Sequence, residues 1–419
     1  MNKFEILLSA VSLFLLFIPL YQLAFTPLSF GKLKKPGKAA SYLRFAVVVS
    51  ARNEESVIGY LLDSLNSQNY PRDKYTVFVI ADNCSDNTYG IAREHGAVTF
   101  ERRDFVNIGK GFALTWFFKI FNRDYRAQYD AVTIFDADNL VDPNFLSVMN
   151  DYLASGEDAV MGYRDSKNPH DSWVSGATSM MWWSMSRFYH TPRARLGLSS
   201  LAGGTGYCFR SELVENGWNT GSLCEDTEFS MQLMIRGKRL GFAREAIFFD
   251  EQPTDIRTSV RQRYRWAVGT YQCLFSCSQK LLSSALMHRG GHLAADGLMF
   301  LLLTPFVGFS TLATLVQLLM IFNEPVKYWL DSLESFVSFA FIGFVLCLIQ
   351  GLLLLKLERK PLRPMLGALI MYPMFLYMTV MINLVTMFYR NPQWRPIKHK
   401  RSISLEQLKL PSNLDISKE

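Results

Sequence analysis

Apolar residues gather in two kinds of stretch along the chain, long runs near both ends and short runs in between. The long runs cover residues 5–25, 296–322, 335–355 and 365–389. A helix needs about 20 predominantly apolar residues to cross a bilayer, and each run is long enough. The pattern therefore predicts a transmembrane helix within residues 1–30 and a transmembrane region over residues 293–390.

The short apolar runs predict the elements of an α/β domain. Runs rich in β-branched and aromatic residues predict buried strands at Phe45–Ser50, Tyr75–Ile80 and Ala131–Phe135. Apolar positions at helical spacing predict helices over residues 54–65, 88–95 and 113–121. Strands that alternate with helices are typical of a doubly wound, mostly parallel sheet. We therefore expect a cytoplasmic α/β domain over residues 31–256.

Charge next to the apolar runs indicates a membrane protein. The 419 residues carry a formal net charge of +7, and the sequence contains no nucleic-acid motif and no zinc-ligand spacing. Lys32, Lys34, Lys35 and Lys38 follow the first run and predict that this side of the helix faces the cytoplasm. A cleaved signal peptide is the alternative, but few basic residues precede the run and an Ala-x-Ala site is missing. The six scattered cysteines are expected to be free thiols.

The sequence of the last third of the chain does not determine on which side of the membrane the C-terminal tail lies. Residues 257–292 are basic and aromatic at first and then amphipathic, which predicts helices along the membrane face. Three spans after a cytoplasmic domain place the tail, residues 391–419, outside the cell. The basic residues of this tail predict the opposite side. A re-entrant segment, or a helix split at Pro305 or Pro373, removes the conflict.

Two carboxylates, Asp136 and Asp138, follow the third predicted strand with one small residue between them. Ligands of open α/β sheets bind just outside the carboxyl ends of the strands. Carboxylate oxygens there suit a divalent cation, Mg²⁺ or Mn²⁺, that holds a phosphate. The alternative is a turn whose acids cap the next helix, because Asp142-Pro143-Asn144 reads as a helix start.

Five more motifs accompany the Asp136/Asp138 pair, and their order along the chain is informative. They are Ser50–Glu55, Asp82–Thr88, Gly109–Gly111, Cys224–Asp226 preceded by the glycine-rich Ala202–Gly206, and Gln262–Trp266. In this order and spacing they resemble the family 2 glycosyltransferases, specifically the membrane-embedded processive synthases of cellulose, mixed-linkage glucan, poly-N-acetylglucosamine, chitin and hyaluronan. The resemblance covers residues 45–270. It implies a nucleotide-sugar-binding domain of the GT-A type, a divalent metal and an inverting transfer from a UDP-sugar.

The resemblance also implies roles for single residues. The residues implied in donor binding are Glu54, Asp82, Lys110, Asp136 and Arg265. Asp82 is assigned to the uracil base and Arg265 to the diphosphate. Asp138 is the principal metal ligand, and Asp136 contacts the nucleotide, the metal or both.

Acceptor and catalytic roles follow in the same way. Asp226 matches the general base, and Glu225 orients it or contacts the acceptor. Trp266 stacks on the acceptor sugar, with Gln262 in support. Cys224 stands where the family usually has threonine, which weakens inference about the sugar.

Each motif also has a purely structural explanation. Asp82–Thr88 forms an Asx-turn and helix cap, Lys110 is a solvated turn lysine, and the acids after Cys224 favour a helix dipole. Gln262–Trp266 then belongs to an interfacial helix with snorkelling arginines. For Trp182 and its aromatic neighbours, core packing or membrane contact is favoured over a sugar platform.

The functional hypothesis is a multi-pass enzyme of the cell membrane. It transfers glucose or N-acetylglucosamine from the UDP-sugar to a growing β-linked polysaccharide and secretes the polymer. The alternative is a non-processive enzyme that adds one sugar to a lipid acceptor. A channel or transporter with a nucleotide-sensing domain is the third interpretation, and it does not require Asp226.

Overall fold

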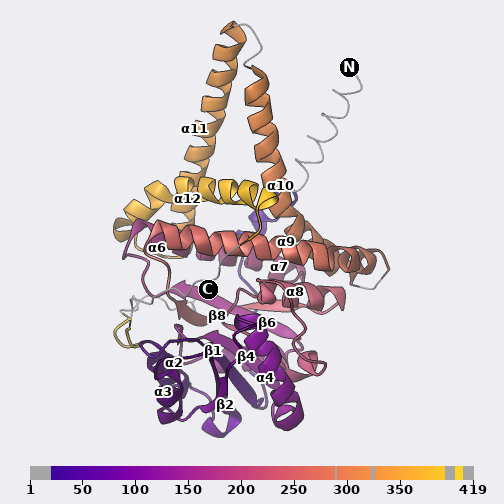
Figure 1. Cartoon of the computed structure of the whole chain (residues 1–419), viewed down its shortest axis with the longest axis vertical. Coiled ribbons are helices and arrows are strands. Elements are labelled where there is room, and N and C mark those ends of the chain that lie inside the picture. The colour runs from indigo at the N-terminus through magenta and orange to yellow at the C-terminus, as the bar shows by residue number, and fades with distance from the viewer. Residues whose placement is uncertain (1–19, 288–289, 322–325, 392–401, 409–419) are drawn as a thin grey trace.

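A computed structural model describes residues 20–287, 290–321, 326–391 and 402–408. An α/β domain forms one end of the molecule, several long helices lie across it, and a helical hairpin projects from the other side (Figure 1). The predicted N-terminal transmembrane helix lies mostly outside the described residues, as does most of the basic tail. The first described element after it is the short 3₁₀ helix η1, Thr26–Phe30.

An eight-stranded mixed sheet organises the α/β domain, with the strand order β3-β2-β1-β4-β7-β6-β8-β5. The strands are β1 Phe45–Ala51, β2 Tyr75–Asp82, β3 Val98–Arg102, β4 Ala131–Asp136, β5 Leu140–Val141, β6 Ala159–Ser166, β7 Tyr207–Arg210 and β8 Leu240–Asp250. The three predicted strands are confirmed as β1, β2 and β4, which pair in parallel. Their register sets Ser50 beside Asp136, so the polar ends of the strands meet at one edge.

The helices of this domain are α2 Ile58–Asn66, α3 Thr88–Glu94, α4 Lys110–Asp124 and α5 Phe145–Ala154. α2 begins later than residue 54, where the spacing predicts it. The preceding residues instead form a turn that is hydrogen-bonded to the next loop. The side-chain oxygen of Asn53 accepts from the Ser85 amide at 2.8 Å, and that of Glu55 accepts from the Asn87 amide at 2.9 Å. α4 begins earlier than predicted, directly after Gly109, whose φ of 133° suits a glycine.

A second group of helices covers the edge where the strands end. It contains α6 Trp173–Ser184, the π-helix η4 Met185–His190, α7 Thr191–Leu196, α8 Glu225–Ile235 and the long α9 Ile256–Met287. α9 is one continuous helix across the domain (Figure 1), and its place along the membrane face stays a prediction.

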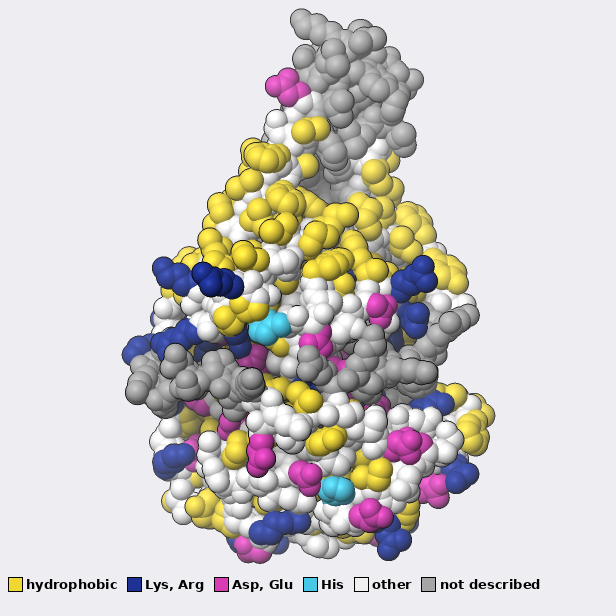
Figure 2. Space-filling model, turned by 90° about the vertical axis from the view of Figure 1, so that its left-hand side faces the viewer, with side chains coloured by type: hydrophobic (Ala, Val, Ile, Leu, Met, Phe, Trp, Pro, Cys, Tyr) yellow, Lys and Arg dark blue, Asp and Glu magenta, His cyan; other side chains and the backbone are white. Residues whose placement is uncertain are grey.

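The chain continues into α10 Gly291–Ile321, α11 Val326–Leu357 and α12 Leu362–Phe388. Among the described residues, three segments are long and apolar enough to cross a membrane: Gly291–Val316, Ala340–Leu357 and Leu362–Phe388. Hydrophobic side chains form a band over these helices, with lysines and arginines below it at both sides of the view (Figure 2). Neither Pro305 nor Pro373 splits its helix. The fold is the expected α/β type with flanking apolar helices.

Candidate active site

A pocket of about 710 Å³ lies where the carboxyl ends of β1, β4 and β8 meet the first residues of α4 and α8 and one face of α9. It brings together all the predicted site residues except Asp82. Those that line it are Glu54, Lys110, Asp136, Asp138, Glu225, Asp226, Gln262, Arg265 and Trp266. Residues more than two hundred positions apart in the sequence therefore share one site, because the sheet register and α9 converge on it.

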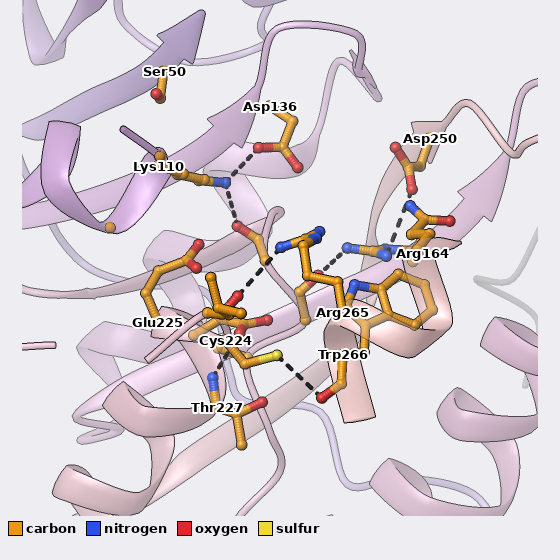
Figure 3. Close-up of a pocket in the computed structure, with 18 of the residues that line it drawn as sticks. Ser50, Lys110, Asp136, Arg164, Cys224, Glu225, Thr227, Asp250, Arg265 and Trp266 are labelled. Carbon is orange, nitrogen blue, oxygen red and sulfur yellow. Dashed lines mark hydrogen bonds and ion pairs between the residues drawn. The ribbon is translucent and has the colours of Figure 1, made fainter. Parts of the chain in front are cut away.

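Lys110 connects the acidic strand end to the glycine-rich loop. Its ammonium group forms an ion pair with Asp136 and donates a hydrogen bond of 2.6 Å to the carbonyl oxygen of Gly204 (Figure 3). Burial opposes its charged form, but the carboxylates of Asp136, Glu225 and Asp226 outweigh burial and raise the pKa of Lys110. A permanent cation therefore sits beside Asp136, where it can meet an anionic ligand.

Asp82 occupies a different position. It ends β2 with its side chain buried, in an ion pair of 2.5 Å between its Oδ1 and Nη1 of Arg102. Asp82 is not among the pocket-lining residues, although Arg52, which lines the pocket, is close enough to lower its pKa. Burial outweighs both arginines and raises the pKa of Asp82. Its assignment to the nucleobase stays a prediction.

Glu225 and Asp226 are the first two residues of α8 and face the pocket. Burial, together with the neighbouring carboxylate of Asp226, raises the pKa of Glu225 to about 7. Burial also raises the pKa of Asp226, against the hydrogen bond of 2.7 Å from the Thr227 amide and the charge of Lys110. A carboxyl group whose pKa is moved toward neutrality suits proton transfer at cellular pH.

Two further charged residues, Arg164 on β6 and Asp250 at the end of β8, also line the pocket. Their closest nitrogen and oxygen lie 3.5 Å apart (Figure 3). Burial and the nearby acids Asp138 and Asp136 raise the pKa of Asp250 to about 7, against the charge of Arg164. Neither residue was predicted from the sequence. Asp250 ends an apolar run as Asp136 does, which was an available signal, whereas Arg164 had none.

Aromatic rings form another wall of the pocket. The guanidinium of Arg164 lies 3.9 Å from the ring centre of Trp182, and the rings of Trp182 and Trp266 are 5.5 Å apart, edge to face. Trp182 thus faces the site. The sequence favoured core packing or membrane contact for this residue instead. Its neighbour Trp183 is buried and donates a hydrogen bond to Asp165.

α9 packs tightly against the start of α8. A Cβ on Gly269 would lie 2.4 Å from the sulfur of Cys224, so a side chain there would push the helices apart. Nη1 of Arg265 donates to the carbonyl oxygen of Leu223 at 3.2 Å. These contacts hold Arg265 and Trp266 beside the acids of α8.

The acidic strand end fits a divalent cation. Mg²⁺ is usually held by one or two carboxylates together with substrate phosphates, and Asp136 and Asp138 provide two carboxylates in the pocket. The described residues include no cluster of three or more acidic, histidine or cysteine ligands.

Comparisons with known proteins agree with this geometry. The family described as "Glycosyltransferase like family 2" matches residues 43–269. The probable glycosyltransferase YdaM of Bacillus subtilis is 27% identical over 246 residues, which are 54% of this chain and 55% of that protein. The beta-monoglucosyldiacylglycerol synthase of Synechocystis sp. is 27% identical over 240 residues, 55% of this chain and 48% of that protein. The chain thus spans about half the length of these curated relatives.

The solved structures support the fold. The mannosyltransferase PcManGT from Pyrobaculum calidifontis, in complex with GDP-Man and Mn²⁺, superposes with a TM-score of 0.51 at 20% identity. The match covers 77% of this chain and 93% of that one. Because the family match covers more than half of the chain, the chain belongs to glycosyltransferase family 2 and is a glycosyltransferase with a GT-A fold.

Proposed function

We propose that this enzyme transfers a hexose, with inversion, from a nucleotide sugar to the hydroxyl group of a membrane lipid. One observation carries the choice of acceptor. The pocket that contains the carboxylates is also lined by Phe300 of α10, a helix long and apolar enough to span a membrane. Met185 and Leu201 line it as well. A polar head and an apolar body can therefore be accommodated in one site.

The donor diphosphate binds at the acidic strand end in this proposal. Lys110 and Arg265 supply positive charge, and arginine matches the geometry of phosphate oxygens. Asp138 and Asp136 would hold a divalent cation, which stabilises the negative charge on the departing diphosphate. The mannosyltransferase PcManGT was solved in complex with GDP-Man and Mn²⁺, which supports a nucleotide-linked hexose as the donor.

Asp226 acts as the general base. It accepts the proton of the acceptor hydroxyl as the hydroxyl oxygen bonds to the anomeric carbon. The bond from that carbon to the diphosphate breaks on the opposite face, and the nucleoside diphosphate leaves with the electron pair. A single displacement of this kind inverts the configuration at the anomeric carbon. Lys110, Arg164 and Arg265 place positive charge near this base, and Glu225, the residue before it, orients the base or contacts the acceptor.

Extension of a polysaccharide is the second candidate. The aromatic pair Trp182 and Trp266 favours it, since two rings offer a platform for sugar units. The order of motifs up to Gln262–Trp266 also resembles the processive β-glycan synthases. The name of the Synechocystis relative points instead to a diacylglycerol acceptor, which is the reason for placing the lipid first.

The test uses the full chain in detergent–lipid micelles with Mg²⁺ or Mn²⁺ and a panel of radiolabelled UDP- and GDP-hexoses. Nucleoside diphosphate release is measured together with the distribution of label between an organic extract and the aqueous phase. We expect release coupled to one sugar per lipid in the extract. High-molecular-weight, glycanase-sensitive aqueous product would establish the second candidate. Release that persists in Asp226→Asn would contradict both mechanisms.

A further inference from the structure

We propose that α12 does not cross the membrane but lies in its surface, on the side of the catalytic domain, with its exposed apolar face in one lipid leaflet. By composition α12 is a candidate span like α10 and the end of α11. In the fold it lies across the base of the hairpin formed by these two helices, and α9 lies beneath it (Figure 1).

The beginning of α12 is attached to the catalytic domain through the turn before it. The two carboxylate oxygens of Glu358 bind Nε of Arg187 at 2.6 Å and Nη2 of Arg244 at 2.9 Å. The hydroxyl of Tyr163 donates to Glu358 at 2.7 Å. Arg187 belongs to η4, and the other two partners belong to β8 and β6. All four side chains are almost fully buried, so this turn is anchored in the α/β domain.

The far end of α12 is attached to α9. The hydroxyl of Tyr264 donates a hydrogen bond of 2.7 Å to the carbonyl oxygen of Tyr389. The guanidinium of Arg390 lies 4.5 Å from the ring centre of Tyr271. α9 itself is bound to the loop before α8, because Gln272 accepts a hydrogen bond of 2.8 Å from the Leu223 amide. Both ends of α12 are therefore tied to the same side of the molecule.

The length of α12 shows why the two attachments are incompatible with a helix that crosses the membrane. α12 has 27 residues, and at about 1.5 Å per residue it is roughly 40 Å long. The hydrocarbon core of a bilayer is about 30 Å thick. If α12 crossed it, its two ends would lie on opposite faces of the membrane. The contacts of Glu358 and Tyr389 exclude that arrangement for as long as they are formed.

The outer face of α12 is apolar, unlike that of a helix exposed to water. Its exposed side chains recur every three or four residues: Leu366 (45%), Ile370 (58%), Met374 (53%), Tyr377 (39%), Met381 (50%), Val385 (51%) and Phe388 (72%). The opposite face packs on α6, α9 and α10 through residues such as Met365, Tyr372 and Phe375. A continuous apolar stripe of this length fits the boundary between headgroups and acyl chains.

Neighbouring surfaces identify the partner as lipid rather than protein. The stripe continues into exposed apolar side chains of the α10–α11 hairpin, such as Phe309 and Leu346. Lys356 and Arg363 are exposed beside the start of α12, where they can meet anionic headgroups. Figure 2 shows the same succession, a band of hydrophobic side chains bordered by a row of basic ones.

This arrangement removes the conflict over topology. α10 and α11 leave the catalytic side and return to it, and α12 stays there. Ile403, Leu405 and Leu408, which follow α12 in the chain, pack against the hydrophobic cluster that joins the sheet to α12. The described residues 402–408 then lie on the side that the charge of the tail predicts.

Spin-label depth measurements test the proposal on the full chain in vesicles of neutral and anionic phospholipid. Labels are placed singly at Leu366→Cys, Met374→Cys and Phe388→Cys after serine replacement of the two partly exposed cysteines, Cys84 and Cys347. We expect the three labels within about 5 Å of one depth, close to the interface. Leu346→Cys on α11 is the matched control and should lie deeper. A maximum of depth at Met374→Cys, with the flanking labels at opposite faces, would overturn the proposal.

A second measurement does not depend on these substitutions. A protease-sensitive tag at the C-terminus is digested in sealed vesicles of known orientation. We expect cleavage of the tag only in vesicles that also expose the catalytic domain. Cleavage from the opposite side would mean that α12 crosses the bilayer.

Discussion

Nη1 of Arg263 on α9 donates a hydrogen bond of 2.9 Å to the backbone carbonyl oxygen of Phe375, in the middle of α12. The same nitrogen lies 2.8 Å from the hydroxyl oxygen of Thr379, and the guanidinium stacks 3.9 Å from the ring centre of Phe375. Arg265, two residues later, faces the pocket instead. One short motif therefore serves both the active site and the helix that we place in the membrane surface.

Loss of Arg263 should weaken the attachment of α12. Burial lowers the pKa of Arg263 to about 10, and hydrogen bonds to a charged group contribute about 1.5–3 kcal/mol each. We expect Arg263→Ala to lower the midpoint of thermal unfolding in detergent by several degrees. Arg257→Ala, on the exposed side of the same helix, is the control and should leave it unchanged. Equal midpoints for the two variants would show that the contact is not stabilising.

Asp226→Asn should abolish turnover while leaving the donor site intact. An amide cannot accept the proton of the attacking hydroxyl, and removal of a general base typically costs about 10²–10⁴ in rate. Nucleoside diphosphate binding, measured by calorimetry, should remain within a few-fold of the parent enzyme. Glu215→Gln, an exposed acid outside the pocket, serves as the control. A kcat for Asp226→Asn within tenfold of the parent would assign the base elsewhere.

The pH dependence of turnover should reflect the burial of the acid pair. Burial raises the pKa of Asp226. Burial and the adjacent carboxylate of Asp226 raise the pKa of Glu225 to about 7. A base with a raised pKa is protonated, and therefore inactive, over a wider range of acid pH. We expect kcat/KM to rise through a pH range above that of an ordinary aspartate near 3.9, and to be still rising near pH 7, where Glu225 titrates. A profile that is flat over this interval would contradict the assignment.

The metal dependence of nucleotide binding should require Asp138. Chelation by EDTA should weaken nucleoside diphosphate binding to the parent enzyme, and Mg²⁺ or Mn²⁺ should restore it. Asp138→Asn should bind weakly under both conditions, because one of the two carboxylates is missing. Asp171→Asn, an exposed residue outside the pocket, should behave like the parent. Full metal-dependent binding by Asp138→Asn would remove this residue from the site.

The sequence predicted three of the eight strands, those whose signals are local. Strands β1, β2 and β4 are short apolar runs that end in polar residues, and their parallel pairing aligns those ends at one edge. The strands β6, β7 and β8 were not predicted. β6 and β8 contain charged as well as apolar residues, and β7 has only four residues, so none of the three shows the pattern of a buried strand.

The positions of several other site residues depend on contacts between residues far apart in the sequence. Asp82 ends its strand as predicted, but the buried Arg102 occupies one of its oxygens. The pairing of Arg164 with Asp250, and the position of Trp182 beside Trp266, likewise arise only when β6, β8, α6 and α9 are assembled.

The sequence by itself determined that the chain combines an α/β domain with long apolar helices. Buried strands and helices show a regular spacing of apolar residues, and long apolar helices show uninterrupted apolar runs, so both can be recognised in the sequence. It also placed Asp82, Asp136 and Asp138 directly after apolar runs, where strands end. It could not tell a helix that crosses a bilayer from one that lies on it, since both require the same apolar composition. Only the tertiary structure decided that for α12, through the contacts of Glu358 and Tyr389 at its two ends.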